Sequence, residues 1–271
     1  MGPDPDDGCK FHAGRKSATF CYTADMLIRG LLSIVFWIWV ALATCMFTML
    51  VGIAALLTGW MDHTRWLPQQ LTALWARAIV LVNPAWRLTV EGRQHLPTSG
   101  AYVLVSNHAS LADIIVLYHL PSPFKWLAKE SLFRIPLLGW SMAWAGNIPL
   151  VREEQRSIRA SFNGALACLQ MGVPVMVFPE GTRSRTGRLG AFKRGAFGLA
   201  IRAGVPVVPI AVTGTRDVVI PGTWILRPAR RIHIRIFPPV VCAQDGPEEA
   251  DRLRDRVRAL IAGALPDTVA T

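Results

Sequence analysis

Charged residues are scarce in this 271-residue sequence. They make up 17% of the chain, whereas hydrophobic residues make up 52%, and soluble domains usually carry about a quarter of charged residues. An ordinary soluble surface is therefore disfavoured, because much of the apolar surface must meet something other than water, and lipid is the obvious candidate. The length suits one compact domain with an appendage and excludes two large domains.

Lysine is also rare, although the chain is strongly basic. The formal net charge is +11, and arginine carries most of it, because lysine occurs only at Lys10, Lys16, Lys125, Lys129 and Lys193. The planar guanidinium group suits phosphate, whether on a nucleic acid, a lipid headgroup or a small substrate. The long apolar run near the N-terminus favours a membrane as the partner and disfavours nucleic acid.

Paired cysteines and several catalytic signatures are missing. The five cysteines are an odd number, widely spread, with no C-x-x-C pair and no histidine at zinc-ligand spacing, so we expect reduced, structural thiols in a domain that faces the cytoplasm. No G-x-S-x-G elbow occurs, which disfavours a serine hydrolase or lipase. No internal repeat is visible, which gives no support to a repeat architecture.

The N-terminal third divides into a tail and an apolar segment. Residues 1–26 form a polar tail, of which Met1 to Arg15 is predicted to be poorly ordered. Residues 27–83 are predicted to anchor the chain in a membrane. The nearly continuous apolar run from Leu27 to Trp60 exceeds the roughly 20 residues that cross a bilayer. Two geometries fit it, a tilted spanning helix or a shallow helical hairpin that bends near Gly52. The late start and great length disfavour a cleaved signal peptide.

A second helix and an α/β domain are predicted to follow. Apolar residues recur at helical spacing before Asn83-Pro84: Leu71, Leu74, Trp75, Ala78, Ile79 and Val82. Residues 84–271 then alternate short β-type runs with helical stretches. The strands expected are 86–90, 101–105, 125–127, 173–178, 205–212 and 232–237, with helices at 153–171 and 247–265. The predicted fold is α/β, a mostly parallel central sheet flanked by helices, with a membrane-embedded helix or helical hairpin at the N-terminus.

The first cluster of chemically able residues follows the predicted strand 101–105. The sequence runs Ser-Asn107-His108-Ala-Ser110-Leu-Ala-Asp113, which places a histidine at the carboxyl end of a strand, where open α/β sheets bind ligands. A histidine there can act as a general base if another group orients its ring. Asp113, one turn into the next helix, can accept the Nδ1 proton, as in the His-Asp half of a triad. The alternative is a structural cluster that caps the helix.

The second cluster is the loop Phe178-Pro-Glu180-Gly181-Thr182-Arg183-Ser184, which follows a buried strand. Glycine permits close backbone approach, the hydroxyls donate hydrogen bonds, and Arg183 can bind two phosphate oxygens. Further basic residues follow at Arg185, Arg188, Lys193 and Arg194. The loop lacks the signatures of a P-loop and of a dinucleotide fold. An anionic, phosphate-bearing substrate is favoured over the alternative of an ordinary solvated turn.

The two clusters, in this order, resemble the glycerolipid acyltransferase family, the bacterial lysophosphatidic acid acyltransferases in particular. The N-H-x-S-x-x-D motif is matched at Asn107, His108, Ser110 and Asp113, and F-P-E-G-T-R-S is intact from Phe178 to Ser184. Two weaker motifs are similar to Phe133-Arg134-Ile-Pro-Leu-Leu-Gly-Trp140 and to Val205-Pro-Val-Val-Pro209-Ile210. The resemblance covers 86–239. Ala109 and Ala112 are smaller than the residues often found there, which bears on the choice of acceptor.

The resemblance implies roles for these residues. His108 would be the general base and Asp113 its orienting partner, while the acceptor phosphate would lie among Arg134, Glu180, Gly181, Thr182 and Arg183. Supporting positions are Asn107, Ser110, Arg152, Lys193 and Pro209. The domain 84–271 would be catalytic, with acyl-CoA or acyl carrier protein as donor and without a metal or bound cofactor. We expect an enzyme of the inner membrane with its active site facing the cytoplasm.

The expected reaction acylates the free hydroxyl of 1-acylglycerol-3-phosphate and gives phosphatidic acid, a step of phospholipid biosynthesis. Alternative acceptors are glycerol-3-phosphate and another lysolipid such as a lyso-ornithine lipid. A non-enzymatic lipid-binding protein explains the hydrophobicity and charge, but it gives no purpose to the His-Asp pair.

Overall fold

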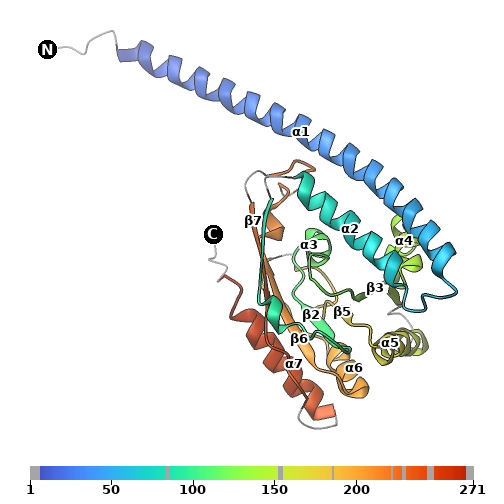
Figure 1. Cartoon of the computed structure of the whole chain (residues 1–271). Coiled ribbons are helices and arrows are strands. Elements are labelled where there is room, and N and C mark those ends of the chain that lie inside the picture. The colour runs from blue at the N-terminus through green and yellow to red at the C-terminus, as the bar shows by residue number, and fades with distance from the viewer. Residues whose placement is uncertain are drawn as a thin grey trace.

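The central sheet has seven strands. The computed structural model describes residues 7–83, 86–151, 155–184, 186–220, 222–227, 230–242 and 247–266. The strands are β1 (Trp86–Glu91), β2 (Val103–Ser106), β3 (Lys125–Lys129), β4 (Ile148–Leu150), β5 (Val175–Val177), β6 (Val207–Thr213) and β7 (Arg230–Ile236). Their order across the sheet is β1-β7-β6-β2-β5-β3-β4. The predicted α/β class is confirmed (Figure 1).

Strand direction decides where the site can form. All neighbouring strands are parallel except β6 and β7. The strands β2, β3, β5 and β6 therefore end at one edge of the sheet, which we call the catalytic edge. In an open α/β sheet the carboxyl ends of parallel strands form the usual ligand crevice. Both clusters found in the sequence follow strands of this group, β2 and β5.

Six of the seven strands match the predicted runs. The missed strand, β4, has only three residues with a proline in the middle, so its sequence carries no alternating pattern. Helices cover both faces of the sheet: α3 (Ala112–Leu117) lies on one face, and α5 (Gln155–Gln170), α6 (Gly195–Ala203) and α7 (Pro247–Ala262) lie on the other (Figure 1). The sequence predicted α5 and α7 but neither α6 nor α4 (Leu138–Trp144).

The first helix is much longer than expected. Helix α1 (Asp7–Thr58) begins inside the segment predicted to be a poorly ordered tail, of which residues 1–6 lie outside the described residues, and it does not bend at Gly52. Once a long helix has formed, each further residue extends it at little cost, which accounts for the earlier start. At Gly52 the missing side chain leaves room for Trp144, whose ring lies 2.9 Å from where a Cβ would be. The chain turns back only after Thr58.

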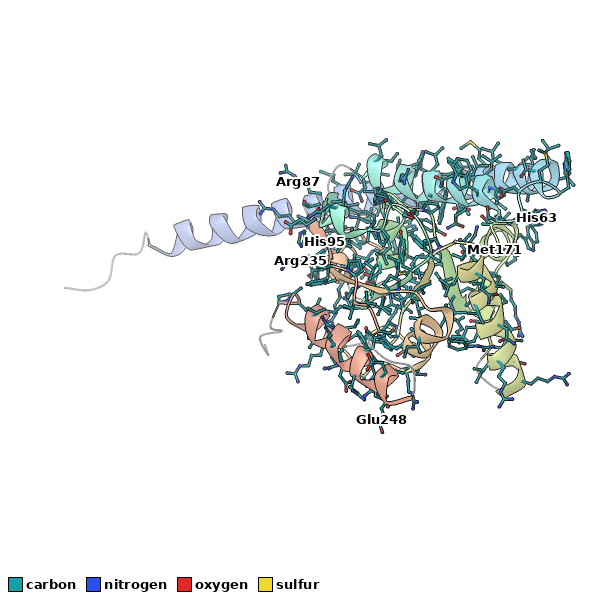
Figure 2. The ribbon with its side chains drawn as sticks, turned by 60° about the horizontal axis from the view of Figure 1, so that its bottom comes forward. His63, Arg87, His95, Met171, Arg235 and Glu248 are labelled. Carbon is teal, nitrogen blue, oxygen red and sulfur yellow. The ribbon has the colours of Figure 1, made fainter. Side chains whose placement is uncertain are left out.

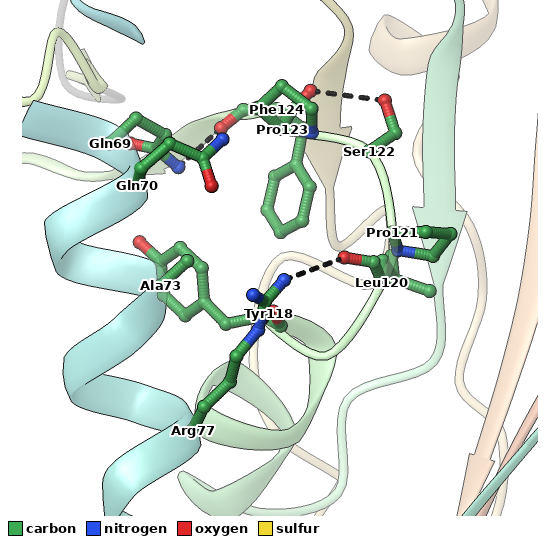
Figure 3. Close-up of a pocket in the computed structure, with 10 residues that line it drawn as sticks. All are labelled: Gln69, Gln70, Ala73, Arg77, Tyr118, Leu120, Pro121, Ser122, Pro123 and Phe124. Atoms are coloured by element: carbon green, nitrogen blue, oxygen red, sulfur yellow. Dashed lines mark hydrogen bonds between the residues drawn. The ribbon is translucent and has the colours of Figure 1, made fainter. Parts of the chain in front are cut away.

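Helix α2 (Trp66–Val82) returns alongside α1 and attaches it to the sheet. Its Gln69 amide donates to the Phe124 carbonyl, and Arg77 donates to the carbonyls of Tyr118 and Leu120 (Figure 3). Small and polar residues of α2 face the domain, while Leu74 remains 51% exposed. Of the predicted apolar face, Ile79 is buried against the domain, whereas Leu74 and Val82 point outward.

A buried lysine secures the turn between the two long helices. The Lys125 ammonium, at the start of β3, donates to the carbonyl of Arg65 at 3.1 Å and to that of Ala145 at 2.6 Å. Burial lowers the pKa of Lys125 to about 8, although nearby Cys168 and Asp62 act in the opposite direction. The lysine thus joins the α1–α2 turn and the end of α4 at the sheet edge opposite the catalytic edge.

Candidate active site

The predicted His-Asp pair is formed. Nδ1 of His108 lies 2.8 Å from Oδ2 of Asp113. β2 ends at Ser106, so His108 lies in the loop just past the catalytic edge, and Asp113 lies in the first turn of α3. The Asp113 side chain is fully buried, whereas 12% of the His108 side chain is exposed. With Nδ1 engaged, Nε2 is the nitrogen left to exchange a proton with a bound hydroxyl.

Asp113 also shapes the loop that carries the histidine. The same oxygen, Oδ2, accepts the backbone N–H groups of Ala109 at 2.7 Å and Ser110 at 2.8 Å. The Ser110 hydroxyl accepts the backbone N–H of Ala112 at 3.3 Å and so caps the start of α3. Because one carboxylate oxygen holds both the ring and the backbone around it, the imidazole has a defined orientation.

An aromatic ring that sequence reasoning did not single out supports the imidazole. Phe178 stacks on His108 with ring centroids 4.0 Å apart and an angle of 8° between the planes. Phe178 also packs against Trp126, and the centroids of these two rings are 5.2 Å apart. The signal was present, since Phe178 is the first residue of the F-P-E-G-T-R-S run, but a stacking role depends on how β2 and β5 pair.

Glu180 bonds to the backbone of two loops. Its Oε1 accepts the backbone N–H of His108 at 2.9 Å, and its Oε2 accepts that of Gly190 at 2.9 Å. Both oxygens are therefore used, and a carboxylate would repel a phosphate group. Glu180 thus joins the His108 loop to the second loop, and its role at the phosphate stays a prediction.

The loop after β5 lies directly against the histidine loop. The backbone N–H of Ser184 donates to the His108 carbonyl at 2.8 Å. Gly181 has a φ of +76°, a conformation that side-chain-bearing residues rarely adopt, and its N–H donates to the Phe178 carbonyl. Thr182 and Arg183, at the outer part of this turn, are exposed. A hydroxyl and a guanidinium are thus available beside the His108 loop.

The remaining predicted residues differ in position. Asn107 bonds both backbone groups of Val212 through its side-chain amide, at 2.8 and 2.9 Å, and joins β2 to β6. Pro209 is buried within β6 beside β2. Lys193 is exposed, and its backbone N–H donates to the Pro179 carbonyl. Arg152 and Arg185 lie outside the described residues.

Arg134 lies beyond the end of β3, at the catalytic edge. Its side chain is 75% exposed and forms an ion pair with Glu130 at 2.8 Å. Such an exposed pair contributes little stability. A phosphate that bound Arg134 would have to share the guanidinium with Glu130, so Arg183 is the better placed of the two predicted arginines.

The His108–Asp113 pair and the basic loop beside it define a class of protein. An imidazole oriented by a buried carboxylate is a general base, and a basic loop beside it suits an anionic substrate. Among the described residues, the imidazole ring bonds to Asp113 and stacks on Phe178, and neither of these is a serine or cysteine. The site therefore fits an enzyme that activates a hydroxyl group of its own substrate.

The sequence is similar to those of known acyltransferases. The Acyltransferase family matches residues 87–213. A 1-acyl-sn-glycerol-3-phosphate acyltransferase of Chlamydomonas reinhardtii is 34% identical over 89% of this chain and 72% of its own length. The human alpha enzyme of the same name is 36% identical over 64% of this chain and 61% of its length. The chain belongs to the acyltransferase family of these enzymes.

A solved structure shares the fold. The crystal structure of the 1-acyl-sn-glycerophosphate acyltransferase PlsC from Thermotoga maritima superposes with a TM-score of 0.70 and covers 90% of this chain and 99% of its own. The sequences are 24% identical, so this likeness supports the fold alone.

Proposed function

We propose that this chain transfers a fatty acyl group from a thioester to the free hydroxyl of 1-acylglycerol-3-phosphate and so produces phosphatidic acid. The names of its relatives support this acceptor. The observation that carries the proposal is the His108–Asp113 pair held directly against the loop that bears Arg183. Other lysolipids and glycerol-3-phosphate remain as alternatives to be tested.

The proposed reaction is a single displacement. Nε2 of His108 removes the proton of the acceptor hydroxyl, and the oxygen attacks the thioester carbonyl. The carbon–sulfur bond then breaks, and the imidazolium returns the proton to the leaving thiolate. Backbone N–H groups or a basic side chain would stabilise the oxyanion. The substrate supplies the nucleophile and the dyad supplies the base, so this scheme uses neither a metal nor a bound cofactor.

We assign the acceptor phosphate to Arg183, with Thr182 and the Gly181 turn beside it. The guanidinium is exposed next to the His108 loop, and its paired N–H donors fit two phosphate oxygens. Arg134, at the same edge, is proposed as a second and weaker contact. Glu180 takes no part in binding and keeps the two loops together.

The outer surface of the helical hairpin attaches the enzyme to a membrane. The apolar segment Met26–Thr58 is long enough to span a bilayer, and a third of its most apolar window is buried in the protein. We propose that α1 lies along the membrane surface. Ser33 bonds to Leu226, and Gly52 packs on Trp144, so the catalytic domain covers one face of the helix over much of that length. A spanning helix is surrounded by lipid on all sides, and a helix with one face covered by an α/β domain cannot be.

We further place the catalytic domain on the cytoplasmic side of the inner membrane. The thiols of Cys45 and Cys168, which form no disulfide in the described part of the chain, suit a reducing compartment. Acyl-CoA and acyl carrier protein are the proposed donors. Labelling of introduced surface cysteines in intact cells and in inverted membrane vesicles would test this side.

A groove between α1 and α4 is proposed to hold an acyl chain. It has a volume of about 650 Å³ and is mostly apolar, with Met49, Ile53, Leu56, Trp140 and Trp144 among its lining residues. It opens beside the surface that would contact lipid. Ala143 also lines it, so Ala143→Phe should shift the preference toward shorter acyl chains. An unchanged preference would place the chain elsewhere.

The direct test is an acyl-transfer assay with the purified chain in vesicles. We expect phosphatidic acid from 1-acylglycerol-3-phosphate, with much slower acylation of glycerol-3-phosphate and of a lysolipid without a phosphomonoester. Acyl-CoA and acyl carrier protein are compared as donors in parallel. A higher rate of transfer to another acceptor would overturn the proposed acceptor. If neither acyl-CoA nor acyl carrier protein supported transfer, the proposed reaction would be overturned.

A further inference from the structure

Two buried polar atoms close to the dyad have no hydrogen-bond partner in the described part of the chain. One is Oδ1 of Asp113, and the other is the hydroxyl oxygen of Thr215. The Asp113 residue is 0% exposed and Thr215 is 1% exposed. All three donors that reach the carboxylate converge on Oδ2. A buried carboxylate oxygen without a donor is costly, so each of these two atoms calls for an explanation.

The fold brings the two elements that carry these atoms, α3 and the short helix η3 (Thr215–Asp217), into contact. Asn107, next to His108, is bonded to Val212 near the end of β6. Gly214, with a φ of +83°, then turns the chain tightly over the backbone of Arg231. Thr215 opens η3, which packs against α3, the helix that carries Asp113. The threonine is thus held in place by the same β2–β6 link that places the histidine.

We propose that Thr215 is a positioning residue of the catalytic dyad, whose hydroxyl donates to Oδ1 of Asp113 either directly, after a small rotation of the side chain, or through one bridging water. The inference rests on the proposed function of the dyad. A hydroxyl offers one donor and two acceptor positions, so it can satisfy the carboxylate in either way. Holding Oδ1 prevents the carboxylate from turning about its Cβ–Cγ bond and keeps Oδ2 on the imidazole.

The test compares a substitution that keeps the volume of Thr215 with one that keeps its hydroxyl. Thr215→Val removes the hydroxyl and keeps the shape, whereas Thr215→Ser keeps the hydroxyl and removes a methyl group. In Thr215→Val we expect kcat to fall about tenfold, the size of a hydrogen bond to a charged group, with the KM for 1-acylglycerol-3-phosphate unchanged. Thr215→Ser should retain most of the activity. Thr213→Val, a nearby threonine at the end of β6, is the matched control and should resemble the unaltered chain.

A pH profile separates this role from a purely structural one. Without the hydroxyl, the carboxylate can turn away from the ring and stabilises the imidazolium less, so His108 should lose its proton at a lower pH than in the unaltered chain. The acid limb of kcat/KM should therefore move to lower pH in Thr215→Val and stay in place in Thr215→Ser. A packing defect alone lowers the melting temperature and leaves this limb where it was.

The same shift can be read without substrate. Titration of the His108 ring by NMR in the three proteins reports its protonation even if the acceptor differs from the one proposed, so the inference does not fall with the proposed function. An unshifted ring titration in Thr215→Val would overturn it. An equal shift in Thr215→Ser would do the same, because it would assign the effect to the lost methyl group.

Discussion

The catalytic edge and the outer face of the α1–α2 hairpin differ in almost every respect. At the catalytic edge, polar groups are buried and joined by short bonds, such as His108 to Asp113 at 2.8 Å and Glu180 to His108 at 2.9 Å. On the hairpin, large apolar side chains face outward, and Leu56 is 80% exposed. Figure 2 shows the hairpin as a layer along one side of the domain, with Glu248 of α7 on the far side.

This difference separates two tasks. The catalytic edge requires fixed geometry, because a base that is misplaced by an ångström loses much of its effect. The hairpin surface requires only sufficient apolar area to bind lipid. Substitutions at the edge should therefore change kcat or the KM of the acceptor, and substitutions on the hairpin should change the delivery of a membrane-borne substrate.

The largest effect is expected from loss of the base. His108→Ala should lower kcat about a thousandfold, the usual contribution of a general base, while binding to vesicles stays unchanged. Acyl-transfer rates and vesicle co-sedimentation measure the two quantities. Activity within tenfold of the unaltered chain would contradict the assignment of His108.

Removing one acceptor from Glu180 should have the next largest effect. In Glu180→Gln the amide nitrogen can no longer accept the N–H group of His108 or Gly190, so one of the two bonds is lost. We expect kcat to fall about 10- to 100-fold, with little change in the KM of the acceptor. Glu248→Gln, on the exposed start of α7, is the control. A change confined to KM would return Glu180 to the phosphate site.

A smaller effect, on binding, is expected from Arg183. In Arg183→Ala the KM for 1-acylglycerol-3-phosphate should rise about tenfold through loss of a charged hydrogen bond, and Arg183→Lys should recover part of this. Arg134→Ala should raise the KM less, because Glu130 already pairs with that guanidinium. The exposed Arg256 of α7 provides a control variant. A larger effect at Arg134 would reverse this ranking.

The smallest effect concerns Lys125, at the opposite edge. Its pKa is lowered to about 8 in the folded chain from 10.5, so between these values the unfolded chain binds more protons and stability should rise with pH. Below pH 8 both states are protonated and this contribution is constant. Lys125→Met should lack the rise, and the difference between the two proteins in urea unfolding from pH 7 to 10 isolates it from Cys168 and the tyrosines. Equal pH slopes would contradict the lowered pKa.

Sequence patterns predicted the parts of the fold that repeat along the chain. Alternating apolar runs located six strands, and helical spacing located α5 and α7. β4 escaped because Ile148-Pro-Leu150 is too short to show a period. The face of α2 that meets the domain stayed open, because apolar spacing cannot distinguish a core from a lipid surface. In the structure Thr72 and Ala76 face the domain while Leu74 points outward.

The site shows the same limit. The spacing of His108 and Asp113 allowed the prediction of their contact. Asp113 follows the histidine by five residues and lies in the first turn of the next helix, so its carboxylate can bend back to the ring. Glu180 was assigned to phosphate from its place in the motif, but its true partners, the N–H groups of His108 and Gly190, depend on how two loops meet. Phe178 and Thr215 likewise depend on strand pairing, which one sequence alone does not report.

The most direct test combines both regions in one experiment. Acyl transfer to 1-acylglycerol-3-phosphate is measured in vesicles and in detergent micelles, for the unaltered chain, for His108→Ala, and for the double variant Leu42→Glu with Leu57→Glu, whose leucines are each 65% exposed and do not line the proposed acyl groove. We predict that His108→Ala loses about a thousandfold in both media. The double variant should lose about a hundredfold in vesicles, from two leucines withdrawn from lipid, and keep its rate in micelles. Activity of His108→Ala within tenfold of the unaltered chain in either medium, or an equal loss by the double variant in both, would contradict the account.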